Sequence, residues 1–220
     1  DEEAVDVVRH FTKLKASLMP YLFTTAVETS RSGIPTMRSM ALEFTQDRNC
    51  QYLDKQYMLG GSLLVAPVFN DEGRGIFYLP QGTWTDFFTG EETTGGVWVE
   101  KEYDYLRLPL MVKENSIIAT GRDDRPDYDY AADAEIRIYC LKEGAETSGV
   151  IYNGKGESDL KISARKQNGE ILLQATASKP YIVRLVNVTG VVASGASVRP
   201  DGNDTILIPD GGNSIVIRPE

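Results

Sequence analysis

Beyond residue 59 the chain consists of strand-length apolar runs separated by glycines and prolines. None of these runs keeps the three- and four-residue apolar spacing of a helix over ten residues, so this part is predicted to be nearly all β. The expected strands are 63–69, 75–79, 83–87, 96–100, 105–108 and 117–120, followed by 134–141, 147–152, 160–165, 171–175, 181–188, 205–208 and 214–218. The dipeptide Asn168-Gly169 between two of these runs predicts a hairpin turn.

The front of the chain has a different pattern. Between residues 2 and 29 apolar side chains recur every three or four positions, which predicts a helix lying on a core. Pro20 inside this stripe predicts a kink or a break, because proline lacks the N–H that a helix interior needs. Gly33 followed by Pro35 predicts the end of the helix.

The run 36–44 is predicted to be one short strand. It is apolar on both faces apart from Arg38 and Glu43, as in a parallel sheet that is covered by helices. One helix and one such strand make a single step of a βα repeat, which cannot close a barrel or a doubly wound sheet. We therefore expect this front section to dock onto partners that the sequence does not contain.

Length and composition indicate a soluble globular protein of more than one domain. At about 150 residues per domain, 220 residues predict two modest domains, or one domain and part of another. Hydrophobic residues make up 41% of the chain and charged residues 25%, which argues against disorder and rod-like folds. The acidic, proline-bearing stretch 121–130 is predicted to be a domain boundary. We see no internal repeat.

Charge and hydropathy exclude two classes of partner. The net charge of −9 has the wrong sign for holding a phosphate backbone, so nucleic acid is not an expected partner. The longest uncharged stretch, 56–70, is too short and too rich in glycine and proline to cross a membrane. No membrane partner is expected either.

The two cysteines, Cys50 and Cys140, are 90 positions apart and lie outside any CxxC motif. They predict neither a disulfide framework nor a thiolate zinc site, and a reducing, cytoplasmic location is the expectation. The chain has no initiator Met and no leader-like start, so we expect it to begin inside a longer polypeptide.

Few residues fit independent catalytic or metal chemistry. His10 is the only histidine, which excludes a two-histidine metal site, and it is expected to pack on its helix. The acidic group Asp123, Asp124, Asp127 and Asp129 lacks the spacing and central glycine of a calcium loop, so a solvated linker is expected.

Aromatic residues in the β region have two interpretations. Asp86 beside Trp84 is reminiscent of a sugar site, but its turn-rich surroundings favour a structural role in a turn. Trp84, Trp98 and their aromatic neighbours could form a platform for sugars, although aromatics at strand spacing more often fill a core.

Four ordered motifs resemble the C-terminal part of glycoside hydrolase family 31. They are LMPYLFTTAVETSRSGIPTMRSMALEF, DKQYMLGGSLLVAPVF, FYLPQGTWTDFFTGE and LRLPLMVKENSIIA. In the family pattern a MPYLY-like helix and a last strand end a (β/α)8 barrel, and a YMLGDSLLVAPV-like segment enters a proximal β-sandwich. The stretch RPDYDY, together with QYLDKQYMLG, is most similar to the α-xylosidase branch.

The resemblance implies a mainly β chain in three parts. Residues 1–58 would be the end of the (β/α)8 barrel, 59–122 the proximal β-sandwich, and 123–220 the distal β-sandwich, which is placed by position alone. Gly61 departs from the family pattern, which carries Asp there; the change removes a local acceptor and argues against a polar role for this turn.

The resemblance also implies that the parent enzyme is exo-acting and retaining on a terminal α-linked sugar, either xylose or glucose, and uses no cofactor or metal. No motif for the family's catalytic aspartates is present, so the catalytic pair is expected upstream. Arg38 and Glu43 are the substrate-binding candidates near the pocket, and a buried ion pair involving Glu43 is the alternative.

The expected partners are the missing N-terminal and barrel portion of the same polypeptide, the oligosaccharide substrate of the parent enzyme, and a second copy of the chain. Two other functions remain open. One is a carbohydrate-binding β-sandwich module that uses Trp84 and Trp98, and the other is a purely structural or oligomerisation domain, whose exposed helix stripe would associate with itself or with the missing front.

Overall fold

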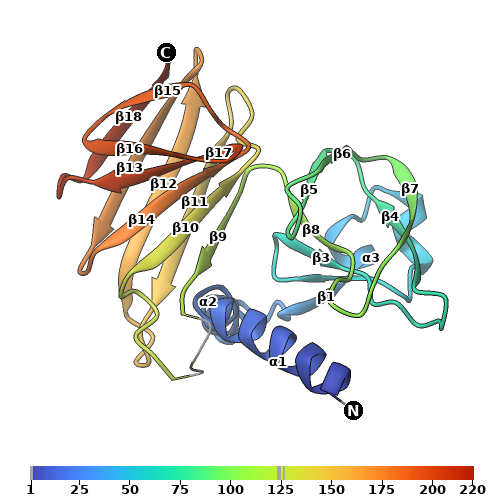
Figure 1. Cartoon of the computed structure of the whole chain (residues 1–220). Coiled ribbons are helices and arrows are strands. Elements are labelled where there is room, and N and C mark those ends of the chain that lie inside the picture. Colours follow the sequence, from blue (N-terminus) through green and yellow to red (C-terminus); the bar gives the residue numbers. More distant parts are fainter. Residues whose placement is uncertain (1, 123–124, 126) are drawn as a thin grey trace. The chain divides into compact units, whose positions relative to one another are not determined.

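The computed structural model describes residues 2–122, 125 and 127–220 (Figure 1). It divides into two compact units. The first unit comprises Asp1–Thr12 and Glu28–Glu114, and the second comprises Lys13–Val27 and Asn115–Glu220. The predicted three-part division into 1–58, 59–122 and 123–220 remains a prediction. Within the described residues, no helix is long and apolar enough to cross a membrane.

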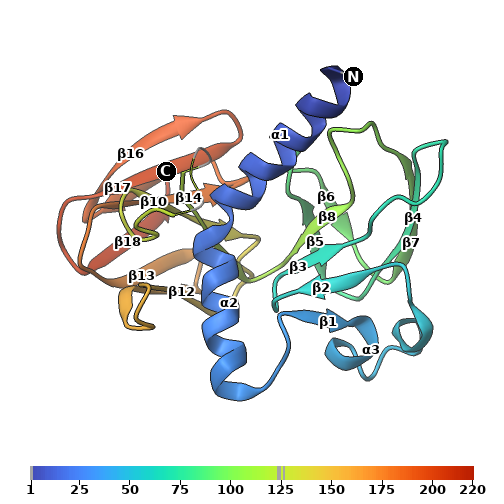
Figure 2. The same ribbon diagram turned by 90° about the horizontal axis from the view of Figure 1, so that it is seen from below.

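Two helices replace the single helix predicted for 2–29. Helix α1 spans Glu2–Ser17 and α2 spans Met19–Ser32, and Figure 2 shows the change of direction where they meet. Pro20 lies in the first turn of α2, where a missing N–H costs nothing, so the predicted break is confirmed. Gly33 has a φ of 76° and donates its N–H to the carbonyl of Thr29, which ends α2 as predicted.

The first unit contains a six-stranded sheet and a two-stranded ribbon. The sheet order is β1-β2-β3-β8-β5-β6, and every neighbouring pair is antiparallel. Its strands are β1 (Met37–Ser39), β2 (Tyr57–Leu59), β3 (Leu63–Val65), β8 (Leu110–Lys113), β5 (Thr83–Asp86) and β6 (Glu92–Thr94). The ribbon pairs β4 (Arg74–Leu79) with β7 (Val97–Glu102). Phe77, Leu79 and Trp84 are buried in the core of this unit.

The prediction of one strand over 36–44 is wrong. Only β1 is extended, and it pairs antiparallel with β2 rather than in a parallel sheet. Ser39 then starts the short helix α3 (Met40–Glu43), because its hydroxyl accepts a hydrogen bond from the N–H of Leu42. A one-turn 3₁₀ helix, η1 (Arg48–Tyr52), follows.

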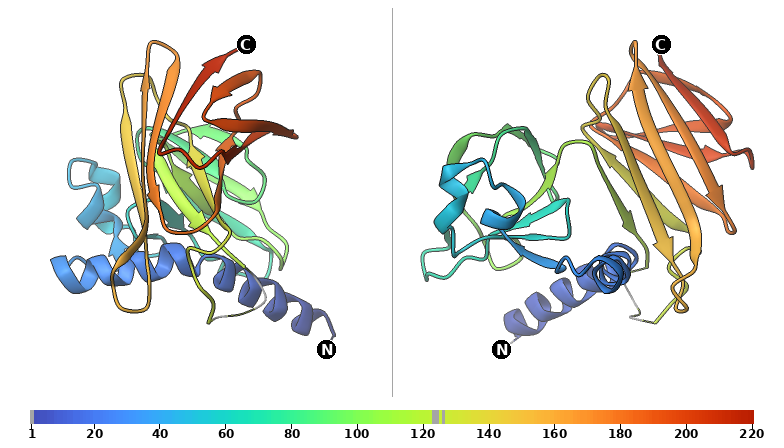
Figure 3. Two further views of the ribbon diagram at one scale, coloured as in Figure 1. Left: turned by 90° about the vertical axis from the view of Figure 1, so that its left-hand side faces the viewer. Right: turned by 180° about the vertical axis from the view of Figure 1, so that it is seen from behind.

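The second unit is a β-sandwich of two five-stranded sheets, which Figure 3 shows packed face to face. The sheet orders are β16-β17-β14-β10-β9 and β11-β12-β13-β18-β15. The strands are β9 (Ser116–Thr120), β10 (Ala134–Tyr139), β11 (Glu146–Tyr152), β12 (Ser158–Gln167), β13 (Glu170–Ala177), β14 (Tyr181–Val186), β15 (Val191–Ser194), β16 (Ala196–Asp201), β17 (Asp204–Pro209) and β18 (Ser214–Pro219). Aliphatic side chains from both sheets form one buried cluster. A sandwich is therefore present where one was expected by position alone.

Most predicted strands exist, with specific exceptions. Residues 105–108 form no strand, and Asp104 instead accepts the N–H of Leu106 in a turn. Strands β2, β6, β8, β15 and β16 were not predicted. Asn168 and Gly169 both have positive φ, 54° and 78°, and connect β12 to β13, so the hairpin turn is confirmed.

The end of the stretch 121–130 is packed and is not only a solvated linker. The hydroxyl of Tyr128 donates to the carbonyl of Ala16 over 2.8 Å, and the ring of Tyr130 lies 5.4 Å from that of Phe23. Burial raises the pKa of Tyr128 above its ordinary value. These contacts fix the segment to the helical part of the second unit.

Candidate functional site

Arg38 and Glu43, the two predicted site residues, form an ion pair. Nη1 of Arg38 lies 3.0 Å from Oε2 of Glu43, and the two side chains are only 16% and 21% exposed. Nε of Arg38 also donates to the carbonyl of Pro35 over 3.0 Å. The expected ion pair is therefore present, although Glu43 lies on α3 and not at the end of a strand, and the assignment of both residues to substrate binding remains a prediction.

Gly61 lies against the same guanidinium. A Cβ atom on Gly61 would be 3.5 Å from Nη1 of Arg38, which is an ordinary contact distance. An aspartate at this position, as in the family pattern, would therefore direct its carboxylate to Arg38. In this chain Glu43 supplies a carboxylate to Arg38.

Glu43 also lines a cavity of about 630 Å³ in the first unit. The cavity lies between the segment that carries α3 and η1 on one side and the end of β4, the turn after it and the turn before β7 on the other. Its lining consists of Glu43, Phe44, Thr45, Gln46, Asp47, Arg48, Asn49, Tyr78, Pro80, Gln81 and Gly96. Most of these side chains are polar, and Phe44 and Tyr78 are the aromatic residues of the lining.

Asp47 organises the wall of this cavity, which we call the α3–β4 cavity. Its Oδ1 accepts the N–H of Asn49 over 3.0 Å and caps η1, and its Oδ2 accepts the hydroxyl of Tyr78 over 2.9 Å. Burial is the main reason that the pKa of Tyr78 is raised. Asp47 and Tyr78 were not singled out from the sequence, although an Asp two residues before Asn49 is a recognisable cap signal.

Gln56 fixes the backbone of Tyr78 from behind. Its Nε2 donates to the carbonyl of Tyr78 and its Oε1 accepts the N–H of Tyr78, both over 2.8 Å. Gln56 belongs to the QYMLG motif. Its side-chain amide thus makes the two hydrogen bonds to Tyr78 that the backbone of a neighbouring strand would otherwise make. Tyr78 is held through its backbone and its hydroxyl at once.

The two tryptophans have opposite environments. Trp84 is fully buried, and its Nε1 donates to the carbonyl of Pro80 over 2.7 Å, so it cannot stack on a sugar. Trp98 on β7 is 57% exposed, and its ring lies 5.5 Å from that of Tyr78. Of the two residues predicted for a platform, only Trp98 is available.

Asp86 has the structural role predicted for it. Its Oδ1 accepts the N–H groups of Phe88 and Thr89 over 2.8 and 2.9 Å, which builds the turn after β5. His10 packs with Phe11 and Phe88 at ring distances of 5.1 and 6.2 Å, as expected for a helix-packing histidine.

A metal site has no support in the described part of the chain, where no group of three His, Cys, Asp or Glu residues is arranged to hold an ion. Asp123 and Asp124 of the predicted acidic group lie outside the described residues. Asp129 pairs with Lys179, which lowers the pKa of its carboxyl.

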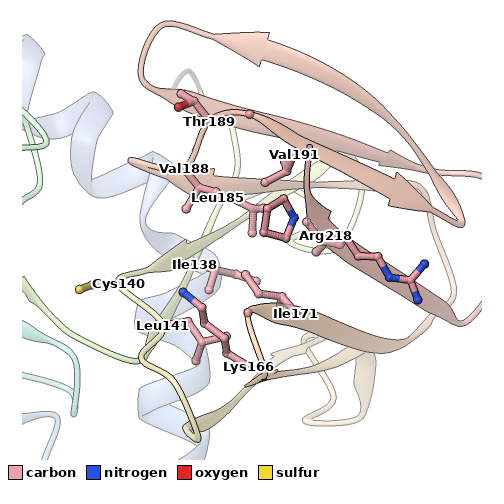
Figure 4. Close-up of a pocket in the computed structure, with 14 residues that line it drawn as sticks. Ile138, Cys140, Leu141, Lys166, Ile171, Leu185, Val188, Thr189, Val191 and Arg218 are labelled. Carbon is pink, nitrogen blue, oxygen red and sulfur yellow. The ribbon is translucent and has the colours of Figure 1, made fainter.

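A second cavity, of about 190 Å³, lies in the sandwich (Figure 4). The labelled residues are Ile138, Cys140, Leu141, Lys166, Ile171, Leu185, Val188, Thr189, Val191 and Arg218. Most of the wall is aliphatic, and the guanidinium of Arg218 pairs with Glu170 over 2.7 Å. This lining offers few directional hydrogen bonds, unlike that of the α3–β4 cavity.

The chain is similar to glycoside hydrolases over nearly all of its length. The family model "Glycosyl hydrolase family 31 C-terminal domain" matches residues 33–118, and "Alpha-xylosidase YicI, C-terminal domain" matches 129–218. Alpha-xylosidase XylQ of Lactiplantibacillus pentosus is 36% identical over 94% of this chain, which covers 26% of that relative. An alpha-xylosidase of Emericella nidulans is 41% identical over 53% of this chain, which covers 16% of that relative.

A solved structure agrees with this similarity. The GH31 dextranase of Flavobacterium johnsoniae in complex with glucose superposes with a TM-score of 0.77 at 26% identity, over 93% of this chain and 31% of the dextranase. The chain thus spans about a quarter of the length of the first of these relatives. It belongs to glycoside hydrolase family 31 and corresponds to the C-terminal domains of the α-xylosidases in that family.

Proposed function

We propose that this chain is the non-catalytic rear part of an exo-acting, retaining α-glycosidase of the α-xylosidase type. The observation that carries the proposal is the match to an alpha-xylosidase along 94% of this chain but only 26% of that enzyme. In this proposal the catalytic carboxylates and the sugar pocket belong to the remainder of the polypeptide. Residues 1–58 complete the (β/α)8 barrel, and the β units brace it.

Exposed apolar side chains support a bracing role. Val5 and Val8 on α1 are 54% and 65% exposed, and Ile34, Met37 and Leu42 are also exposed. These residues come from the segments that resemble the end of the barrel. Large apolar side chains gathered in such segments are typical of a surface that is covered by a partner, and the missing barrel is the partner proposed here.

The contacts of the predicted site residues support a structural contribution by this chain. Arg38 and Glu43 neutralise each other, and Asp47 is used to cap η1 and to bind Tyr78. A retaining glycosidase needs two carboxyl groups about 5 to 5.5 Å apart across the scissile bond. Glu43 and Asp47 are each engaged in contacts that hold the fold together, which favours a catalytic pair elsewhere in the polypeptide.

The test compares the 220-residue chain with the longer polypeptide that contains it, using a chromogenic α-xyloside. We expect turnover by the longer protein and none by the chain alone. Turnover by the chain would refute the non-catalytic assignment, and absence of turnover on both α-xyloside and α-glucoside by the longer protein would refute the enzyme assignment.

A matched pair of variants tests the bracing role in the longer protein. Val8→Asp places a charge on the surface assigned to the barrel, whereas Val192→Asp places one on a half-exposed strand of the sandwich. We expect Val8→Asp to lower the yield of folded, active enzyme and Val192→Asp to leave it unchanged. Equal effects would contradict the docking of α1 on the barrel.

We also propose a cytoplasmic location for the parent protein. Cys50 and Cys140 are both free thiols, which suits a reducing compartment. Fractionation of the producing cells, with activity in the cytosolic fraction, is the expected result. Activity in the culture medium would refute it.

A further inference from the structure

The α3–β4 cavity has the chemistry of a site for a neutral sugar. Sugars present hydroxyl groups at their edges and flat patches of C–H on their faces, so they need polar groups beside an aromatic ring. The cavity of about 630 Å³ is large enough for one or two sugar rings, since ordinary ligand sites span roughly 300 to 1,000 Å³.

Several polar groups in the wall are available to a ligand. The side chains of Gln46, Arg48 and Gln81 are exposed, and none of them has a hydrogen-bond or ion-pair partner among the described residues. Two amides and one guanidinium offer donors, and the amides add acceptors. This mixture suits hydroxyl groups, which donate and accept at the same time.

The charges of the wall favour an uncharged ligand. The carboxylate of Glu43 is paired with Arg38, and that of Asp47 already accepts two hydrogen bonds. Arg48 adds one positive charge, which is too little to select a phosphate or a sulfate over a neutral molecule. The wall therefore has no strong preference for anions or cations.

Trp98 is not part of the cavity lining, but its exposed ring lies beside a lining residue. Its register partner on β4 is Tyr78, a lining residue, and the two rings lie 5.5 Å apart. Because Tyr78 is held by Asp47 and Gln56, the ring that supports Trp98 is fixed before any ligand arrives. Such preorganisation lowers the entropic cost of binding.

The turn between β6 and β7 places a glycine at the same cavity. Gly96 has a φ of 82°, and a Cβ on it would lie 2.3 Å from Nε2 of Gln81. Any other residue would displace the amide of Gln81 from the wall. Gly96 therefore leaves open the space that this exposed amide occupies.

We propose that the α3–β4 cavity binds a neutral saccharide, with Trp98 stacking on one sugar face and Gln81 and Arg48 bonding its hydroxyl groups. The site is argued from the cavity alone, and only the choice of α-linked probes rests on the proposed function. Binding in the millimolar range is expected for one ring on one platform, with a Kd of about 1 mM.

The two tryptophans permit a direct test by NMR on the ¹⁵N-labelled chain. Its spectrum has two indole N–H signals, one from exposed Trp98 and one from buried Trp84. Isomaltotriose, maltotriose, xylose and β-linked xylotriose are titrated to about 50 mM, with glycerol as a control that has hydroxyl groups but no flat face. We expect a saturable shift of the Trp98 signal with saccharide, and no shift of Trp84 or with glycerol.

Variants distinguish binding at this site from nonspecific adsorption of saccharide. Trp98→Ala and Gln81→Ala are each expected to weaken saccharide binding at least about tenfold by calorimetry, an effect of about 1.4 kcal/mol. Tyr105→Ala removes another exposed aromatic ring of the same unit, which lines a different cavity, and should leave binding unchanged. The Trp84 signal checks the fold of every variant.

Three results would overturn the proposal: no shift at the highest concentration, equal shifts of Trp84 and Trp98, or unchanged binding by Trp98→Ala. Binding of β-linked saccharides alone would keep the site but remove its link to an α-glycosidase. Failure of the longer protein to hydrolyse an α-xyloside would refute the proposed function while leaving this binding result intact.

Discussion

Replacement of Gln56 by leucine should destabilise the first unit strongly, because its side chain satisfies two buried backbone groups. Both hydrogen bonds, from Nε2 to the carbonyl of Tyr78 and from the N–H of Tyr78 to Oε1, measure 2.8 Å. Gln56 itself is 6% exposed. Leucine has a similar volume but can neither donate nor accept, and water has little access to replace it.

The magnitude follows from the cost of unpaired groups. A buried N–H or C=O without a partner costs about 1–3 kcal/mol, so two of them cost about 2–6 kcal/mol. Burial of the leucine side chain returns about 1–2 kcal/mol relative to the amide. We expect Gln56→Leu to lower the free energy of unfolding of the first unit by about 2.5 kcal/mol, the difference between the midpoints of these two ranges.

Urea unfolding followed by tryptophan fluorescence measures this effect in the right unit. Trp84 and Trp98 are the only tryptophans, and both belong to the first unit, so the signal does not depend on the second. Gln51→Leu is the matched control, because Gln51 is exposed, and a change within about 0.5 kcal/mol is expected there.

Gln56→Glu tests the same reasoning if the leucine variant fails to fold. A protonated glutamic acid can donate to the carbonyl of Tyr78 and accept from its N–H, whereas a carboxylate can only accept. Burial raises the pKa of such a carboxyl, so the variant should be near wild type at acidic pH and lose stability as the pH rises. Equal stability of wild type, Gln56→Leu and Gln56→Glu at all pH values would refute the argument.

Three further outcomes follow from single positions. Gly61→Asp should raise the unfolding free energy of the first unit by about 0.5–1 kcal/mol, because the new carboxylate faces Arg38; loss of stability in a urea titration would contradict this. Gly169→Ala should lower the free energy of unfolding by about 1 kcal/mol, measured by thermal circular dichroism, because φ at Gly169 is 78°. Gly154 has no positive φ, and both glycines have open space for a Cβ, so Gly154→Ala should leave the stability unchanged. Equal effects of the two substitutions would refute the backbone explanation. Burial raises the pKa of Cys50 from 9.0 to about 11, so its contribution to stability is complete below pH 9 and lost as the pH rises through 11. Cys50 should resist alkylation at pH 8 until the protein unfolds, and rapid labelling of the native chain would contradict its burial.

The β elements could largely be predicted because their signals are local. Strand runs such as 134–141 and 171–175 alternate or cluster apolar residues between turn residues, and the structure places β10 and β13 there. Strand β8 is a buried apolar run that was missed beside the strand predicted at 105–108, whereas the missed strands β6 and β16 are mostly exposed and carry no apolar pattern. Their pairing with β5 and β17 is what makes them strands.

The error at 36–44 has a physical reason as well. The apolar residues of this run indicate burial, but burial alone does not distinguish a strand from one turn of helix. Ser39 favours the helix because its side chain caps α3, so the chain changes from β1 to a helix within two residues. A serine four residues before Glu43 is a cap signal that was available in the sequence.

The candidate site was only partly predictable. The ion pair of Arg38 and Glu43 follows from two opposite charges in an apolar run, which need each other when they are half-buried. The α3–β4 cavity, by contrast, brings Asp47 to Tyr78 across 31 positions. No spacing rule in the sequence links such residues.

The sequence by itself determined the family, the mainly β character, the helix break at Pro20 and the hairpin at Asn168-Gly169, since each rests on ordered motifs or on the backbone preference of single residues. Tertiary structure alone decided which tryptophan is exposed, which carboxylates are neutralised, and where polar side chains surround a cavity. Trp84 and Trp98 both lie in strand-like runs, yet the pairing of β5 with β8 buries the first, and the ribbon of β4 and β7 exposes the second. Solvent exposure depends on which segments meet in space, and contacts between distant residues are fixed only when the whole chain has packed.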